Sequence, residues 1–419
     1  MTTDLSRAQW LTVIGMGDDG VAGVLPAARQ ALKKASHLFG AARHLARIDP
    51  RAAPCAQRHA WPSPLREGIT ALLTKRHTPG VVAVVSGDPF YYGLGRWLVQ
   101  HVPMTEMRVM PAVSSIALAC ARLGWSQQEI AVLSLHGRDE TTLHRLLEEG
   151  QRLLVLTSDA NAPHRIAGML SAAGFARSQL TLFEALGGHS ERCRPFQIDG
   201  FLAAAPTDIH PLNMMALELV ADDLTRCHGL AAGRPDELFE HDGQITRSDV
   251  RAITLAHLQP HPGQCLWDIG AGSGAVAIEW LRSHERMSAF AIERHPQRCQ
   301  CIRRNAARFG VPHLVLIAHD LQQDVAAALS SCSCPDAVFI GGGASHDVVA
   351  YAMRRLKRGG RLVINAVTLE TEQLLYRLAV HHGGLLHRIG IERVEPLGRM
   401  RGWKPARTIV QWCWQHGKS

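Results

Sequence analysis

The sequence lacks the cysteine spacing on which many metal, redox and disulfide-rich proteins depend. Ten cysteines are spread over 419 residues without a disulfide-like framework, and no two have the Cys-x-x-Cys spacing of zinc or redox sites. The two close pairs, Cys299/Cys301 and Cys332/Cys334, are each separated by a single residue. We therefore interpret the cysteines as cytosolic thiols and predict no metal site.

Long apolar segments are also missing. The first residues, MTTDLSRAQWLTVIG, lack a basic region followed by a long apolar core and a cleavage site. Runs such as VVAVVSG (81–87) are far shorter than the roughly 20 residues that a membrane helix needs. No repeat period is visible either. We therefore expect a soluble, cytoplasmic protein without a membrane partner.

Aromatic residues are scarce, at 5% of the chain, and the basic residues form no runs. Both features argue against nucleic acid, whose binding relies on clustered cations and stacking side chains. The formal net charge is nevertheless +8. Nucleic acid, a membrane surface or a polycarboxylate substrate would each suit that charge, and we expect neither of the first two.

Short β-branched runs alternate with longer helical patterns along most of the chain. Examples are LTVIGMG (11–17) before VLPAARQALKKASHLFG, and GVVAVVSGDP (80–89) before FYYGLGRWLVQHV. The alternation predicts parallel α/β sheets, and the length predicts about two to four domains. The turn-rich stretch CHGLAAGRPDELFEHDGQ (227–244) interrupts it. We predict domains at 8–222 and 245–419, a linker and lead-in at 223–244, and subdomains of about 8–103 and 104–222.

The stretch LWDIGAGSGAVAIEWL (266–281) combines an apolar strand, a glycine turn and a helix. Gly270, Gly272 and Gly274 allow a sharp turn and let a ligand approach the helix N-terminus closely. Their G-x-G-x-G spacing differs from the G-x-G-x-x-G of dinucleotide sites. Asp268 at the strand end would repel a pyrophosphate but suits a cationic ligand without phosphate. S-adenosylmethionine, with its ammonium and sulfonium groups, is such a ligand.

Two more acids follow at the next predicted strand ends. Glu293 ends the run MSAFAIE, about twenty residues past the turn, where a carboxylate can accept both hydroxyls of a ribose. Asp320 ends LIAHD, where an adenine amino group would lie. Thr246 is a candidate cofactor contact, and Thr246 or Ser248 is a candidate N-cap of the preceding helix. Three acids at successive strand ends together predict a cofactor site.

Residues from about 228 to 419 therefore resemble class I S-adenosylmethionine-dependent methyltransferases. Members of that family that methylate amino groups usually carry Asn/Asp-Pro-Pro-Tyr after the fourth strand, where this chain has Gly341, Gly342 and Gly343. These glycines either open space for a bulky or flat substrate or simply form a turn. This half alone is also similar to RNA methyltransferases of the adenine N1 type, which would assign the basic charge to nucleic acid.

The N-terminal half carries a second glycine pattern with different spacing. Successive strand ends hold Gly15 and Gly17, then Gly87, Asp88 and Pro89, then Ser114 and Ser115, then His136 and Arg138. Gly87 and Pro89 suit a tight loop against the methionine end of the cofactor, and the serine hydroxyls suit a helix start. Asp88 either binds the cofactor ammonium or caps its own turn. His136 and Arg138 either meet a substrate carboxylate or lie on the surface.

This order of GxG, GDPxxxG, P-x-x-SS and HGR resembles the tetrapyrrole methylase family over about residues 8–220. That family binds S-adenosylmethionine between two small α/β domains, so the resemblance implies one cofactor molecule in each half of the chain. The two halves together resemble the fused, decarboxylating precorrin methyltransferases of cobalamin synthesis. In that family the N-terminal domain methylates carbon 5. The C-terminal domain methylates carbon 15 and decarboxylates the ring C acetate, so that precorrin-6B becomes precorrin-8.

The resemblance implies a tetrapyrrole substrate with several carboxylates. The basic stretch LGRMRGWKPARTIVQW (397–412), which includes Arg401, is either a carboxylate clamp or a solvated hairpin. Methyl transfer to an enamine-like carbon needs no strong general base, so we assign no catalytic residue. Both component families commonly self-associate, and we expect a homo-oligomer. A scaffolding role for one half is disfavoured because both sets of glycines and acids are intact.

Overall fold

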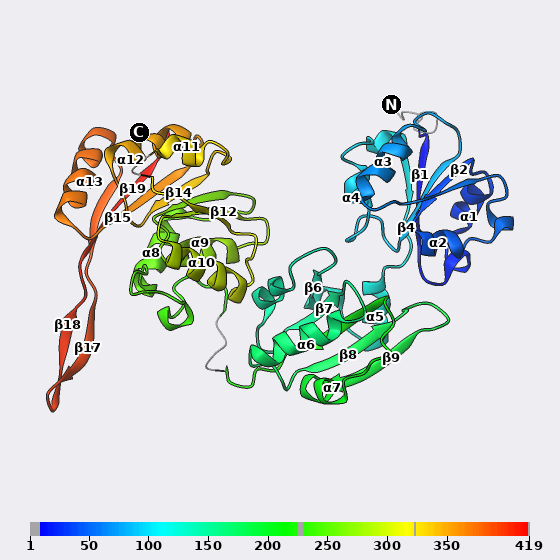
Figure 1. Cartoon of the computed structure of the whole chain (residues 1–419), viewed down its shortest axis with the longest axis horizontal. Helices are drawn as coiled ribbons and strands as arrows, with labels where there is room; N and C mark the ends of the chain where they lie inside the picture. Colours follow the sequence, from blue (N-terminus) through cyan, green and yellow to red (C-terminus); the bar gives the residue numbers. More distant parts are fainter. Residues whose placement is uncertain (1–8, 225–228, 322–323, 418–419) are drawn as a thin grey trace. The chain divides into compact units, whose positions relative to one another are not determined.

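The computed structural model describes residues 9–224, 229–321 and 324–417, and the chain divides into two compact units (Figure 1). Unit 1 comprises Met1–Arg138 and Glu149–Leu224, and unit 2 comprises Asp139–Glu148 and Thr225–Ser419. The short segment 139–148 thus belongs to unit 2, although it lies within the sequence of unit 1.

The first sheet of unit 1 is entirely parallel, with strand order β3-β2-β4-β1-β5. Its strands are β1 (Leu11–Met16), β2 (His37–Gly40), β3 (Gln57–Ala60), β4 (Val81–Ser86) and β5 (Met107–Met110). The helices between them are α1 (Pro26–Lys33), α2 (Ala42–Ala46), α3 (Leu65–Leu73) and α4 (Gly95–Leu98). Because β5 pairs with β1, this sheet continues to Met110, beyond the subdomain boundary that we placed near residue 103.

The second sheet of unit 1 is mixed, and the prediction of parallel sheets throughout is wrong here. Its order is β6-β7-β10-β8-β9, from β6 (Ile130–Ser134), β7 (Arg152–Leu156), β8 (Gln179–Glu184), β9 (Arg192–Gln197) and β10 (Asn213–Glu218). Only β6 and β7 are parallel, because β8 and β9 form a hairpin and β10 inserts antiparallel between β7 and β8. Helices α5 (Ser115–Leu123), α6 (Ala162–Ala172) and α7 (Ile198–Ala204) accompany this sheet.

Unit 2 is built on one seven-stranded sheet of order β13-β12-β11-β14-β15-β19-β16. Five strands are parallel: β11 (Cys265–Ile269), β12 (Ser288–Glu293), β13 (Val315–Ala318), β14 (Ala337–Ile340) and β15 (Arg361–Ala366). Strand β19 (Ile409–Gln415) is antiparallel to both β15 and β16 (Leu385–Ile389). The carboxyl ends of the five parallel strands therefore share one edge of the sheet.

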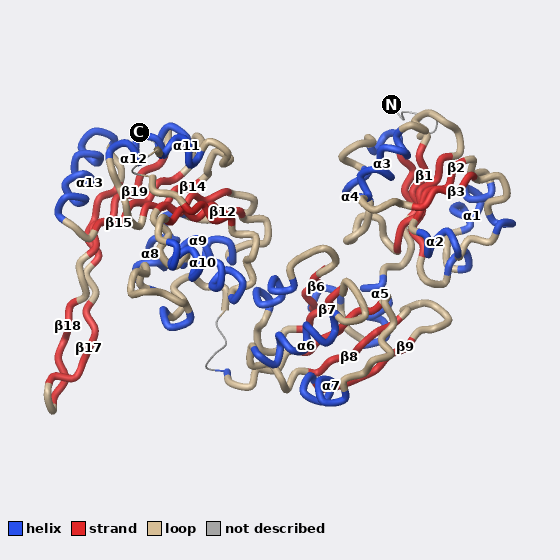
Figure 2. Tube along the Cα trace, viewed as in Figure 1, coloured by secondary structure: helices blue, strands red, loops and turns tan. Residues whose placement is uncertain are grey.

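Helices cover both faces of this sheet, as the blue and red tubes of Figure 2 show. One face packs on α8 (Ser248–Leu258), α9 (Ala275–Arg282) and α10 (Pro296–Arg308), and the other on α11 (Val325–Leu329), α12 (His346–Arg355) and α13 (Leu369–His382). Alternate residues of β11 supply the two cores: Leu266 packs in the first, and Trp267 in the second. Asp268 is two residues beyond Leu266, so its side chain points to the same face of the sheet, toward α9.

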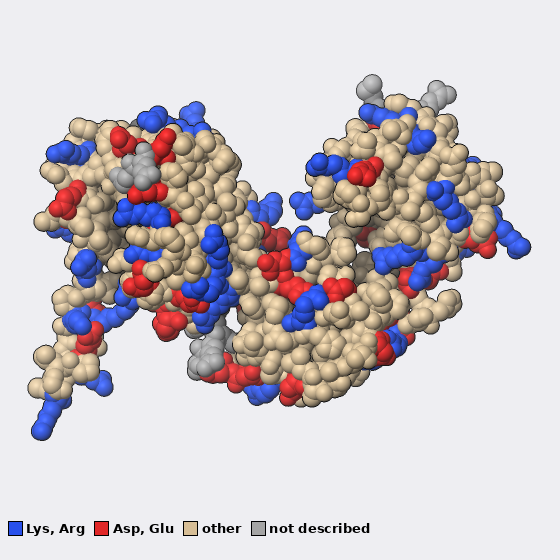
Figure 3. All heavy atoms as spheres, viewed as in Figure 1, with Lys and Arg blue, Asp and Glu red and all other residues tan. Residues whose placement is uncertain are grey.

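Between β16 and β19 the chain forms a projecting hairpin of β17 (Glu392–Leu397) and β18 (Met400–Pro405) (Figure 1). The first part of the basic stretch, residues 397–405, therefore forms the turn and second strand of a hairpin in which Arg401 is exposed, whereas residues 409–412 belong to β19. At its base Arg393 pairs with Asp249 at the start of α8, and Lys404 pairs with Glu395. Figure 3 shows Lys and Arg mixed with Asp and Glu over the visible faces, as the dispersed basic residues predicted.

The lead-in to α8 is packed, although we predicted a linker there. In residues 229–247, Arg234 and Phe239 are buried, and a short 3₁₀ helix spans Asp236–Leu238. Residues 225–228 of the predicted linker lie outside the described residues. Helix α8 begins at Ser248 with Arg247 as its N-cap and has no side-chain cap, so the predicted capping by Thr246 or Ser248 is wrong. Instead, the carbonyl of Thr246 accepts a hydrogen bond from Arg251.

Candidate functional site

The glycine turn of unit 2 lies at the carboxyl edge of the sheet, between β11 and α9. Gly270, Gly272 and Gly274 all adopt left-handed backbone conformations, with φ of 67°, 60° and 78°. A Cβ on Gly270 would overlap the carbonyl oxygen of Gly342, and one on Gly274 would press on Ile302 at 3.2 Å. The turn thus requires glycine for its conformation and for its close neighbours. It delivers the N-terminus of α9 to the sheet edge.

Asp268 lies directly beneath this turn and is completely buried. Its Oδ2 accepts a hydrogen bond of 3.0 Å from the amide of Ala277, whereas Oδ1 has no hydrogen-bond partner among the described residues. Burial raises the pKa of Asp268 to about 7, and Glu293 adds to the rise while the Ala277 amide opposes it. A buried carboxylate with a vacant acceptor favours a cationic ligand.

The two other predicted acids lie on the neighbouring strands. Glu293 ends β12, and its carboxylate accepts hydrogen bonds from the amides of Gly272, Arg294 and His295 at 2.9–3.0 Å. It therefore helps to hold the glycine turn in place. Asp320 lies two residues beyond β13 and pairs with Arg294 at 3.1 Å. Asp268, Glu293 and Asp320 follow the strand order β11-β12-β13, as the sequence predicted.

The fourth strand of this edge ends in the three glycines. The amide of Gly341 donates to the carbonyl of Ile269, so the backbone of β14 runs against the end of β11. All three glycines are exposed, and a Cβ on Gly342 would meet nothing within 4 Å. A Cβ on Gly341 would instead lie 2.9 Å from the ring of Phe339, so the free space is at Gly342, on the opposite side of β11 from Glu293.

Buried polar residues that we did not predict support this site from behind. Glu279 on α9 pairs with Arg251 on α8 at 2.7 Å, and neither side chain is more than 1% exposed. Glu279 also accepts from the amides of Gly233 and Arg234. Asn305 on α10 binds both the amide and the carbonyl of Glu240 and the carbonyl of Ser273. The sequence signal that could have predicted this buried pair is Glu279, the one acid in the otherwise apolar stretch AVAIEWL (275–281).

In unit 1 three loops meet at the carboxyl edge of the first sheet. Gly15 in β1 lies so close to the next loop that a Cβ would overlap the carbonyl oxygen of Gly87 and lie 2.6 Å from the amide of Ala112. Gly87 has φ of 50°, and its amide donates to the carbonyl of Met16. A Cβ on Gly17 would lie 2.7 Å from Asp19 in the same loop. The structure thus brings together Gly15, Gly87 and the segment before α5.

The polar residues of these loops have local partners. Asp88 accepts a hydrogen bond of 2.8 Å from the amide of Phe90, so it caps its own turn. Ser114 is the N-cap of α5 and accepts from the amide of Ala117 at 3.1 Å, while Ser115 begins the helix and is exposed. Pro89 is buried, and its carbonyl accepts from Gly95. We predicted that Asp88 either binds the cofactor ammonium or caps its own turn, and the hydrogen bond from Phe90 shows the capping role.

His136 and Arg138 are exposed beyond the end of β6. The loop that carries Asp88 reaches this strand, because the hydroxyl of Tyr92 donates to the carbonyl of Val132 at 2.9 Å. Tyr92 has φ of 54°, and Phe90, Tyr91 and Tyr92 are all at least 41% exposed. An aromatic loop thus lies beside β6, a feature that we did not predict.

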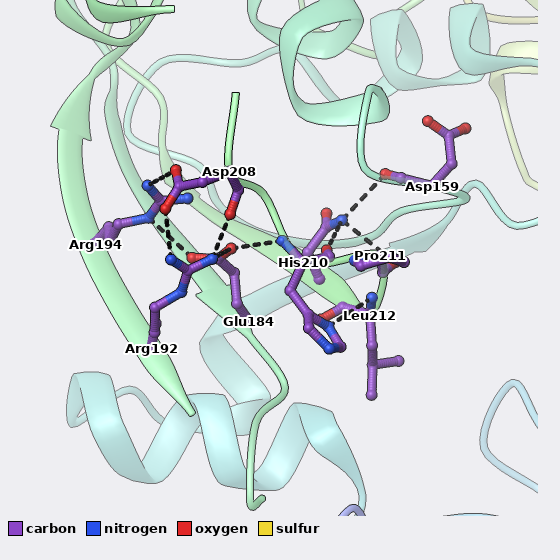
Figure 4. A network of polar contacts seen from close by, with 9 residues as sticks. Asp159, Glu184, Arg192, Arg194, Asp208, His210, Pro211 and Leu212 are labelled. Atoms are coloured by element: carbon purple, nitrogen blue, oxygen red, sulfur yellow. Dashed lines mark hydrogen bonds and ion pairs between the residues drawn. The ribbon is translucent and has the colours of Figure 1, made fainter. Parts of the chain in front are cut away.

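The end of β8 is fixed by an ion-pair network (Figure 4). Glu184 is fully buried and pairs with Arg192 at 2.6 Å and with Arg194 at 2.9 Å, and the amide of His210 donates to it. Asp208 bridges the same two arginines. These ion pairs, with the hydrogen bond from His210, hold the loop before β10 against the end of β8.

Both sites fit S-adenosylmethionine by their own geometry. In unit 2, Asp268 offers its unpartnered oxygen to a cation, and α9 begins directly after the glycine turn, so that its N-terminal amides lie at the sheet edge. In unit 1, Gly15 and Gly87 bring three backbone segments together without side chains. Within the described residues, no helix is both long and apolar enough to cross a membrane.

Two family descriptions match the chain, one in each half. Tetrapyrrole (corrin/porphyrin) methylases match residues 11–199, and the precorrin methyltransferase domain matches residues 237–416. A precorrin-6Y C(5,15)-methyltransferase [decarboxylating] of Sinorhizobium sp is 44% identical over 409 residues, which are 97% of this chain and 97% of that protein.

Two shorter relatives each match part of the chain. A cobalt-precorrin-7 C(5)-methyltransferase of Salmonella typhimurium is 32% identical over 185 residues, 43% of this chain and 88% of that protein. A probable cobalt-precorrin-6B C(15)-methyltransferase (decarboxylating) of Saccharolobus solfataricus is 32% identical over 145 residues, 33% of this chain and 71% of that protein. The relative that matches nearly the whole chain is thus named for carbons 5 and 15, and the two partial relatives are named for carbon 5 and for carbon 15.

Proposed function

Because this chain belongs to the precorrin-6Y C5,15-methyltransferase (decarboxylating) family, and is thus an S-adenosylmethionine-dependent C-methyltransferase, we propose that it methylates one precorrin twice. The methyl groups go to carbons 5 and 15, and the ring C acetate is lost as carbon dioxide. The observation that carries the proposal is that each half has its own glycine-lined strand ends, around Gly15 and Gly87 and around Asp268 and Gly270.

The two reactions are divided between the halves in this proposal. The N-terminal half methylates carbon 5, and the C-terminal half methylates carbon 15 and decarboxylates. Separate relatives named for C(5) and for C(15) support two distinct methylations, and the two halves of the chain match different families. Tethering two sites in one chain favours successive reactions on one substrate, because the second site is at high effective concentration.

Each half binds one cofactor molecule. In unit 2, Asp268 accepts from the ammonium group, Glu293 faces the ribose, and Asp320 and Thr246 complete the site. In unit 1, the backbone of Gly15, Gly17, Gly87 and Pro89 holds the methionine end, with Asp88, Ser114 and Ser115 at its rim. When bound, S-adenosylmethionine supplies an electrophilic methyl group on a sulfonium.

The residues of both sites act by positioning rather than by proton transfer. A meso carbon of a reduced tetrapyrrole is an enamine-like nucleophile, so the chain needs to hold it in line with the methyl group and exclude water. The open space at Gly342, within the Gly341–Gly343 segment, receives the flat macrocycle. Asp268, buried on the α9 side of the glycine turn, serves the cofactor and not the substrate.

Basic residues near each site meet the carboxylates of the substrate. In unit 2 these lie on the β17–β18 hairpin, where Arg399 and Arg401 are exposed. The hairpin leaves the sheet at the end of β16, on the same edge as the glycine turn. In unit 1 the corresponding residues are His136 and Arg138. A homo-oligomer, a cytoplasmic location and the absence of a nucleic acid partner stay predictions.

The test is the mass of the product formed by the full chain from S-adenosylmethionine and reduced precorrin-6. We expect two methyl groups gained and one carbon dioxide lost. No change in the precorrin, together with methyl incorporation into bulk tRNA, would contradict the proposal and restore the RNA alternative, which none of the relatives described above supports.

A further inference from the structure

Three potential metal ligands converge in unit 2 from elements that are far apart in the sequence. They are His257 near the end of α8, His387 on the edge strand β16 and Cys413 on β19. One ligand atom from each lies within 4.8 Å of the other two, and the imidazole centroids of the two histidines are 5.2 Å apart. All three side chains are half-buried.

The sheet register explains why these side chains meet. His387 pairs with Gln411 and Leu385 pairs with Cys413, so that His387 and Cys413 point to the same face of the sheet. Gln411 fixes which face this is, because its Nε2 donates to Thr254 on α8 at 3.1 Å. His257 is three residues further along the same helix, on the same side as Thr254.

One of the three side chains has an unused ligand atom. Nδ1 of His387 is buried and has no hydrogen-bond partner among the described residues. The thiol of Cys413 lies 3.6 Å from Oε1 of Gln411. A divalent cation that binds there would deprotonate this thiol.

We propose that His257, His387 and Cys413 bind one Zn²⁺ ion, with a fourth position left to water. Imidazole and thiolate are ligands that zinc prefers, and Zn–N and Zn–S bonds of about 2.0–2.3 Å place tetrahedral ligand atoms roughly 3.3–3.8 Å apart. The present arrangement needs to contract by about 1 Å, which small side-chain rotations provide. Binding releases the thiol proton to solvent, and no electron is transferred.

The site lies away from the methyltransferase chemistry. Ile389 and Ile409 pair next to the carboxyl edge of the sheet, whereas Cys413 and Leu385 pair toward the opposite edge. The ion therefore ties the end of α8 to the last two strands. Cysteine spacing could not reveal it, because a single cysteine contributes and 156 and 26 residues separate it from the histidines.

The full chain, stripped of metal with a chelator, is titrated with Co²⁺ as a spectroscopic substitute for Zn²⁺. We expect one equivalent to produce a thiolate-to-cobalt charge-transfer band, which Zn²⁺ then abolishes by displacement. Cys413→Ser should lose the band, and His257→Ala or His387→Ala should weaken binding more than about 100-fold, because even second-shell changes weaken metal binding by 10–100-fold. Cys334→Ser, which changes an exposed thiol, is the matched control.

A second measurement covers variants that fold poorly. One equivalent of Zn²⁺ added to the unmodified chain in weak buffer should release about one proton and raise Tm by about 5 °C. A charge-transfer band that persists in Cys413→Ser, or that disappears in Cys334→Ser, would overturn the assignment. Binding of neither metal to the unmodified chain would overturn it as well.

Discussion

Asp268 is the residue at which the fold and the proposed chemistry oppose each other most directly. Burial raises its pKa from the ordinary carboxyl value of 3.8 to about 7 in the folded chain. Between these two pH values the folded chain keeps a proton on Asp268, whereas the unfolded chain has released it. Folding stability from this group is therefore lost as pH rises from about 4 to about 7. A cationic ligand reverses the preference, because it favours the ionised carboxylate.

Asp268→Asn should separate these two effects. We expect the variant to be more stable than the unmodified chain by roughly 1–4 kcal/mol at about pH 8, with the difference shrinking toward about pH 5. Denaturant unfolding across this pH range measures the difference in stability.

Binding of S-adenosylhomocysteine to the C-terminal site, measured in a Gly87→Trp background, should weaken about tenfold from about pH 8 to about pH 6. Asp268→Asn should bind weakly at every pH, and Asp347→Asn, at an exposed carboxyl, should change nothing.

The buried pair of Arg251 and Glu279 carries the packing of the lead-in segment. Glu279→Gln weakens one ion pair and the hydrogen bonds to Gly233 and Arg234 while Arg251 stays buried, so we expect a loss of about 3 kcal/mol of unfolding free energy. Glu285→Gln, at an exposed acid on the following turn, is the control and should change stability by less than about 0.5 kcal/mol. Equal effects of the two substitutions would show that the pair is not a stability determinant.

At the scale of single elements, glycines divide into those that the fold requires and those that it tolerates. Gly15→Ala places a Cβ against the backbone of Gly87 and Ala112, and we expect a cost of about 3 kcal/mol. Gly168→Ala, within α6 and with nothing within 4 Å of the new Cβ, should instead stabilise by about 0.5–1 kcal/mol. Thermal unfolding of both variants tests this, and a stabilised Gly15→Ala chain would contradict the crowding at the loop junction.

The β17–β18 hairpin is the element proposed to meet substrate carboxylates. Arg399→Ser combined with Arg401→Ser should raise KM for the precorrin several-fold, with binding of S-adenosylhomocysteine unchanged, because both side chains lie outside the cofactor sites. Arg66→Ser, an exposed cation on α3, is the matched control. An unchanged KM in the double variant would contradict a role of these arginines in binding the substrate.

Elements and strand-end residues were predictable because their signals are local. Alternation of apolar runs and glycine turns identified the parallel strands and placed Asp268, Glu293 and Asp320 on adjacent strand ends. The mixed second sheet was not predictable, since the position of β10 between β7 and β8 depends on long-range pairing that no local pattern encodes. The same holds for Asn305 and Glu279, whose partners are 28 or more residues away in the sequence.

At the scale of the whole molecule, the proposed double methylation needs two separate sites in one chain. Neither half contributes glycines or acids to the proposed cofactor site of the other, so each site can be blocked without touching its counterpart. Gly87→Trp fills the N-terminal loop junction, and Gly150→Trp is its control, since Gly150 is also left-handed but has nothing within 4 Å of a new Cβ. Asp268→Ala removes the buried carboxylate of the C-terminal site.

The most direct measurement is the position of labelled methyl groups in the product when these variants act on reduced precorrin-6 with methyl-labelled S-adenosylmethionine. The Gly87→Trp product should carry label only at carbon 15 and should have lost carbon dioxide. Asp268→Ala should lose both the carbon 15 label and the decarboxylation, while Gly150→Trp behaves as the unmodified chain. The reverse pattern, or loss of both methyl groups in each variant, would contradict the division of the two methylations between the halves.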